Sequence, residues 1–182
     1  MKQNHDATVV TPSHDEVFVD RIMKTCLDNT GIRAALRRAD NPETEYQSWG
    51  VLAYASVDLD SDNDRLSHAL VAADIARTGA QKTASSVSLG QALARCYSER
   101  SRDAQAQAKL RRILACQSIP ELVRILRPIL RFIASRNAGP LDYASLLRDL
   151  RYFGFNKGRE RVKIKWAKAF YGSLAKGDDD VD

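Results

Sequence analysis

The sequence is poor in the residues that disulfide frameworks, metal sites and membrane spans require. It has 3 Cys, 3 His, 9 Gly and 5 Pro among 182 residues. Cys26, Cys96 and Cys116 are odd in number and lack CxxC spacing, so we expect buried, reduced thiols in a reducing cytoplasm. No apolar run reaches the roughly 18 residues of a membrane span, and the first residues lack the apolar core of a signal peptide. We therefore expect a cytoplasmic protein with no membrane partner.

Catalytic and cofactor motifs are also missing. The chain has no GxGxxG or GxxxxGK[ST] phosphate loop and no GxSxG nucleophile elbow. The acidic stretch Asp58–Asp64 has the alternating spacing of a calcium loop. However, the glycine of the sharp turn is replaced by Asn63 and the glutamate at the twelfth position by Ala69. We therefore expect no metal, no cofactor and no enzymatic activity, and we interpret the acidic stretch as a loop followed by a helix N-cap.

Apolar spacing predicts that the chain is all-α. The clearest segment is residues 119–136, in which Leu122 and Leu126 belong to a row of apolar residues spaced by three and four. Ser118, with a glutamate three residues later, forms the capping box that marks a helix start. Pro128 lies inside this segment and is expected to kink or divide the helix. Similar spacing elsewhere predicts eight or nine helices in two packed groups, without a convincing β-strand.

Charge is distributed unevenly along the chain. Residues 1–94 contain 9 Lys and Arg against 13 Asp and Glu, whereas residues 95–176 contain 19 against 6, a net charge of +13. Such a region is typical of proteins that bind a polyanion, although a solubilising surface is the alternative. With a polar connection at 98–102, the pattern predicts four regions: a flexible segment at 1–12, an N-terminal helical subdomain at 13–100, a basic C-terminal helical bundle at 101–175 and an acidic tail at 176–182.

Basic side chains recur on the polar faces of the predicted helices, where they could neutralise phosphates. Trp49 and Trp166 fall on apolar faces, so we expect both in the core, whereas Tyr97, Tyr152 and Phe155 could be exposed. With few exposed aromatics for base stacking, backbone tracking is favoured over base recognition. Solubility and local ion pairs are the alternative role of these cations. The candidate nucleic-acid-binding residues are Arg33, Arg37, Arg38, Arg111, Arg112, Arg124, Arg127, Arg131, Arg161, Lys165 and Lys168.

Several motifs in this order resemble the CasB family, the small subunit of the type I-E CRISPR surveillance complex, Cascade. They are GIRAALRRA at 31–39, SLGQALA at 88–94, KLRRIL at 109–114, ELVRILRPILR at 121–131, LDYASLLRDL at 141–150 and KWAKAFYG at 165–172. The resemblance implies an all-helical, noncatalytic subunit, present as a pair of copies beside other Cascade subunits. It also implies contact with crRNA and target DNA that stabilises the R-loop during antiviral defence.

The resemblance also implies which residues of this chain bind nucleic acid. Basic positions of the family correspond to Arg37, Arg38, Arg65, Arg111, Arg112 and Arg127. The chain departs from relatives that carry a second basic residue after Arg127, because that position is Pro128, and Arg131 is the expected substitute. Two other hypotheses stay open at this stage. The basic faces could dock acidic protein partners in a scaffold without touching nucleic acid, or the chain could process RNA with surface Arg and His.

Overall fold

The computed structural model describes residues 11–83, 85–97 and 103–179, without the side chains of 103 and 175–179. The expected flexible segment and the connection at 98–102 lie mostly outside this part of the chain. Within it, the fold is all-α, as predicted, and a single parallel bridge joins Val87 to Leu141. The helices in chain order are α1 (His14–Asp28), α2 (Thr30–Leu36), the 3-10 helix η1 (Glu45–Ser48), α3 (Trp49–Tyr54), α4 (Asp62–Thr78), α5 (Leu89–Arg95), α6 (Asp103–Ala115), α7 (Ile119–Ser135), α8 (Tyr143–Phe153) and α9 (Asn156–Asp179).

Polar caps fix where the helices begin. Ser13 and Glu16 form a complete capping box at the start of α1, as do Ser88 and Gln91 at the start of α5. At α7, only one of the two hydrogen bonds of the predicted capping box is present. The Ser118 hydroxyl accepts the amide of residue 121, whereas the glutamate side chain there accepts the backbone amide of residue 117 instead. Local sequence therefore sets the helix starts before tertiary packing acts.

Helix α7 is continuous from Ile119 to Ser135, so of the two outcomes predicted for Pro128, a kink or a division, the division is wrong. Pro128 is exposed, and the hydrogen bond that it cannot donate would end on the carbonyl of Arg124, another exposed residue. Water can hydrate that carbonyl, so the missing bond costs less than it would inside the core. The apolar face of α7 consequently stays in one piece.

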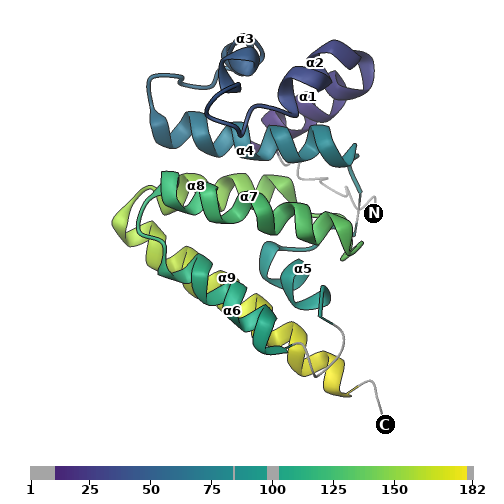
Figure 1. The fold of residues 1–182 in the computed structure, drawn as a ribbon, viewed down its shortest axis with the longest axis vertical. Helices are drawn as coiled ribbons and strands as arrows, with labels where there is room; N and C mark the ends of the chain where they lie inside the picture. The colour runs from purple at the N-terminus through teal and green to yellow at the C-terminus, as the bar shows by residue number, and fades with distance from the viewer. Residues whose placement is uncertain (1–10, 84, 98–102, 180–182) are drawn as a thin grey trace, which may run out of the picture.

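Helix α4 organises the packing. Every residue from Ser67 to Ala76 is buried, and α4 packs against α1, α2, α3, α7 and α8. Figure 1 shows α1–α3 on one side of α4, with α7 and α8 on the other and α5, α6 and α9 beyond them. The two helical groups share one continuous hydrophobic cluster.

Helix α5 makes its most extensive packing with α9, although the sequence boundary places it in the N-terminal subdomain. Gly90 allows this approach, because a Cβ there would overlap the backbone oxygen of Trp166. The glycine of the SLGQALA motif is thus a contact point between two helices. At its far end, α9 continues to Asp179 and includes part of the segment expected to be an acidic tail.

The exposed fractions of two aromatic side chains differ from the predictions. Trp49 is 40% exposed rather than part of the core, and Tyr97 is 5% exposed rather than on the surface. Trp166 is buried, and Tyr152 and Phe155 are exposed, as predicted. All three cysteines are buried and unpaired, which confirms their predicted state.

Candidate nucleic-acid interface

Two predicted arginines, Arg33 of α2 and Arg37 directly after it, are fixed at the C-terminal end of α4. The Nε atoms of Arg33 and Arg37 both donate to the carbonyl oxygen of Ala76, at 2.9 and 3.1 Å. The last carbonyls of a helix lack partners within the helix and carry its partial negative charge, so two guanidinium groups are favoured there. Each guanidinium uses its Nε in this contact, which leaves its Nη donors for other acceptors.

A buried carboxylate holds two further arginines beside this pair. The side chain of Asp40 is 1% exposed and accepts a bidentate pair from Arg77, at 3.0 and 2.9 Å. The Nε of Arg127, on α7, lies 3.5 Å from the same carboxylate. Arg77 also donates to the backbone oxygen of Arg37, at 3.2 Å. We call Arg33, Arg37, Arg77 and Arg127 the Asp40 cluster; it joins α2, α4 and α7.

The exposed face of α7 extends the Asp40 cluster. Arg124 and Arg131 are exposed, and no carboxylate among the side chains that the structure describes forms an ion pair with either. Both lie within four residues of Arg127, so the three share one side of the helix. The predicted row on α7 is therefore present, with one member tied to Asp40 and two facing solvent.

Aromatic contacts place more cations on the α6 side of α7. The Nζ of Lys109 lies 4.9 Å from the ring centre of Phe132, and the guanidinium of Arg136 lies 5.3 Å from it. Arg112 is one turn from Lys109 on α6 and shares its side. Arg111 is about 200° around the helix from Lys109 and points away; its Nη2 donates to the side chain of Gln107 at 3.3 Å.

Other predicted residues lie outside this surface. Arg65 is held by Glu45 at 3.5 Å and Asp62 at 2.7 Å, and it donates to the backbone oxygen of residue 59. Arg38 donates to the side chain of Gln47 at 3.2 Å. Carboxylate and amide partners from neighbouring segments thus occupy these two arginines.

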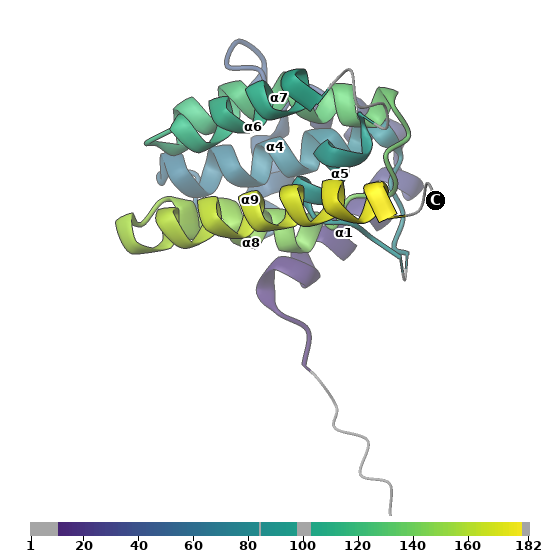
Figure 2. The ribbon, with the colours of Figure 1, turned by 90° about the horizontal axis from the view of Figure 1, so that it is seen from below.

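The basic residues of α9 form a separate group. Lys165 is paired with Asp149 at 2.7 Å and donates to Ser145 at 3.0 Å, whereas Arg161 and Lys168 are exposed. Figure 2 shows α6 and α7 on one side of α4 and α8 and α9 on the other. Most of the predicted cations, with others, therefore gather in two bands. The α7 band is made of the Asp40 cluster with Arg124, Arg131, Lys109, Arg112 and Arg136, and the smaller α9 band is made of Arg161, Lys165 and Lys168.

Sequence reasoning missed Asp40, Arg77, Lys109 and Arg136 as parts of this surface. Arg77 lies in the last turn of a predicted helix, where a cation is favourable, and this was the available signal. Lys109 lies one turn before Arg112, so helical spacing alone could have added it. Nothing local marks Asp40, because its partner is 37 residues away.

The titratable groups do not assemble a catalytic site in the described part of the chain. Among those residues, no group of three His, Cys, Asp or Glu side chains could hold a metal ion. Burial raises the pKa of the Cys96 thiol to about 11, which keeps it protonated and unreactive at neutral pH. No helix in the described ranges is long and apolar enough to cross a membrane.

Comparisons with known proteins point in one direction. A family model described as CRISPR-associated protein Cse2 matches residues 32–171. The fold is similar to that of CasB from M. ruber, with 25% identity, a TM-score of 0.73, and coverage of 94% of this chain and 100% of that one. A Cse2-family protein from Thermus thermophilus is 24% identical, with a TM-score of 0.69 over 88% of this chain and 99% of its own.

A chain in a CRISPR RNA-guided surveillance complex is also similar. It is 22% identical, with a TM-score of 0.70, and the match covers 93% of this chain and 98% of that one. No curated protein matches the sequence.

Proposed function

The chain belongs to the CRISPR-associated Cse2 family, and from this premise we propose that it is a noncatalytic small subunit of a type I-E Cascade. In this role it binds nucleic-acid backbone and supports crRNA-guided binding to target DNA. Its partners are the other Cascade subunits, crRNA, target DNA and a second copy of itself, in the cytoplasm.

One observation carries the nucleic-acid part of the proposal. Arg37 and Arg127, which are 90 positions apart in the sequence, meet in the Asp40 cluster, and Arg124 and Arg131 continue the row along α7. Guanidinium groups held by a carbonyl and a carboxylate lose little side-chain entropy when they bind a phosphate. The band therefore suits an extended polyanion that is bound by charge rather than by base sequence.

The consequence for the R-loop follows from its energetics. The RNA–DNA heteroduplex is about as stable as the DNA duplex it replaces, so modest protein contacts to phosphates shift the balance. A few fixed arginines on the α7 band can supply such contacts. Binding of a separated strand there would slow its return to the duplex.

A scaffold function is the second candidate, and one observation favours it. Leu27, Tyr46 and Tyr54 are 59%, 59% and 83% exposed on the α1–α3 side of the molecule. Exposed apolar side chains of this size are typical of protein contacts. In a pure scaffold, these residues would dock protein partners and the α7 band would bind no nucleic acid.

A salt series with two charge-matched double variants tests the proposal. Arg124→Gln with Arg131→Gln removes two cations from the α7 band, and Arg161→Gln with Lys168→Gln removes two from α9. We expect the first pair to weaken binding to single-stranded DNA about tenfold and to reduce the slope of log K against log salt by about 1 to 2. We expect the α9 pair to change both quantities less.

Two results would overturn the nucleic-acid function. One is binding that does not depend on salt, or no binding at all, with the helical content of the protein intact. The other is an equal loss in both double variants, which would indicate dependence on net charge rather than on the α7 band. Assembly with the other Cascade subunits in the absence of DNA binding would then support the scaffold.

A further inference from the structure

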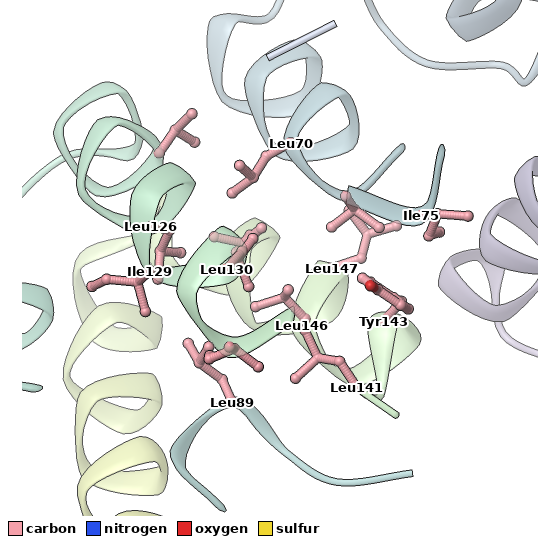
Figure 3. Close-up of a cluster of buried hydrophobic side chains, with 14 of the residues drawn as sticks. Leu70, Ile75, Leu89, Leu126, Ile129, Leu130, Leu141, Tyr143, Leu146 and Leu147 are labelled. Atoms are coloured by element: carbon pink, nitrogen blue, oxygen red, sulfur yellow. The ribbon is translucent and has the colours of Figure 1, made fainter. Parts of the chain in front are cut away.

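A cavity of about 450 Å³ opens beside the α7 band, where α4 and α7 end. Leu130, Ile133 and Ala134 of α7 and Pro140 of the following loop form apolar walls, and Thr78 of α4 adds a hydroxyl. Leu130, Leu141 and Tyr143 line the cavity and also belong to the buried cluster that Figure 3 shows. Small-molecule sites span roughly 300–1,000 Å³ and combine apolar walls with a few polar groups, so this cavity has the size and lining of a binding site.

The loop that closes the cavity is held in place. Asn137 and Gly139 have φ values of 49° and 102°, in the left-handed region, and so the chain turns sharply after α7. Val87 then donates to the backbone oxygen of Pro140 at 2.8 Å and accepts from the amide of Asp142 at 2.9 Å. These bonds fix the wall before any ligand arrives, which reduces the entropic cost of binding.

The row of arginines on α7 leads to the mouth of the cavity. Ala134 lies seven residues after Arg127 and three after Arg131, so all three share one side of the helix. Arg77 of the Asp40 cluster directly precedes Thr78 in the wall. A strand whose phosphates contact Arg127 and Arg131 would therefore pass the opening.

The buried carboxylate of Asp74 disfavours a phosphate inside the cavity. Asp74 lines it, is 3% exposed, accepts from the Tyr143 hydroxyl at 2.9 Å and lies 3.7 Å from Arg77. A phosphate close to this acidic group would be repelled and would lose its hydration, whereas a neutral planar ring with N–H donors would find acceptors there. Phosphates are favoured on the arginines outside, and a base is favoured within.

We propose that this cavity takes one unpaired nucleobase of the strand whose phosphates bind the α7 band. The inference rests on the proposed function and deepens it, because the sequence alone favours backbone tracking without base contact. The base would leave its stack, as bases of single strands do readily, and would be enclosed by Leu130, Ile133 and Pro140. The hydroxyls of Thr78 and Tyr143 are already bonded to Asp74 and to each other, so few hydrogen-bonding groups remain free and the cavity would accept several bases.

The test compares two strands with the same number of phosphates, an oligodeoxycytidine and an abasic strand of equal length. Charge contacts are the same for both, so the ratio of their affinities reports contact with bases. We expect the unchanged protein to bind the oligodeoxycytidine about tenfold more tightly. Ala134→Leu should abolish that preference and leave the affinity for the abasic strand unchanged, because the added side chain fills the opening.

Ala108→Leu is the matched control, since Ala108 is also an exposed helical alanine but lies on α6, away from the cavity. It should keep the preference for the base-bearing strand. As a second variant, Asn137→Gly removes an amide at the mouth while tolerating the left-handed backbone, and it should reduce the preference severalfold.

The outcomes separate the two proposals. Equal affinity of the unchanged protein for both strands, with normal salt dependence, overturns the base pocket and leaves the proposed function standing. A preference that survives in Ala134→Leu, or is lost equally in Ala108→Leu, also overturns the pocket. If neither strand binds, the proposed function fails, and the inference that depends on it fails too.

Discussion

Replacing Arg77 with alanine should lower the free energy of unfolding by about 2–4 kcal/mol. Arg77 makes two charged hydrogen bonds to Asp40, at 3.0 and 2.9 Å, and the Asp40 side chain is only 1% exposed. Without Arg77, water cannot fully replace these bonds, and a buried carboxylate is left with Arg127 at 3.5 Å as its nearest charged partner. That remaining contact keeps the loss below the roughly 5 kcal/mol at the top of the range for a broken buried pair.

Urea denaturation, followed by the helical signal, would measure the loss. Arg124→Ala is the control, since it removes an exposed arginine from the α7 band and should change stability by about 0.5 kcal/mol or less. In the double variant Asp40→Ala with Arg77→Ala, the Asp40 carboxylate is no longer left buried without Arg77, so its loss should be smaller than the sum of the two single losses. A loss in Arg77→Ala no greater than in Arg124→Ala would refute the reasoning that Asp40 depends on this partner.

Three further substitutions test the close helix packing and the pH dependence of stability. Gly90→Ala should destabilise the protein by about 2 kcal/mol or more, because its Cβ would overlap the backbone oxygen of Trp166; Gly172→Ala, which meets no atom within 4 Å on the exposed face of α9, should stabilise it by about 0.5–1 kcal/mol. Thermal melting distinguishes the two, and similar shifts in both would contradict the close helix approach. Burial raises the pKa of Asp74 above its ordinary 3.8, against the opposing hydrogen bond from Tyr143. Because the folded state holds this proton more tightly than the unfolded state, the associated stabilisation is present at low pH and is lost as pH rises through the folded-state pKa. The Asp74→Asn variant has no such group, so its free energy of unfolding relative to that of the unchanged protein should increase from pH 4 to pH 7 in urea titrations. A difference in unfolding free energy that stays constant with pH would contradict a raised pKa of Asp74.

The sequence by itself determined the helices and the family. Apolar spacing of three and four defines one face of helices such as α1 and α7, and local caps such as Ser13 and Ser118 define where helices begin, so the all-α class follows without tertiary information. The row containing Arg124 and Arg131 follows from the same spacing, because residues one turn apart must share a side.

Only the tertiary structure decided which basic side chains remain free to bind a phosphate. Lys165 follows the same helical pattern as Arg124, yet Asp149, from α8, pairs with it. Arg65 has a local partner in Asp62, and Glu45, from η1, adds a second carboxylate. Helical periodicity is local, whereas ion pairing depends on which faces meet after folding. The meeting of Asp40 with Arg77 and the cavity between the ends of α4 and α7 arise in the same way, from contacts between segments that are distant in the chain.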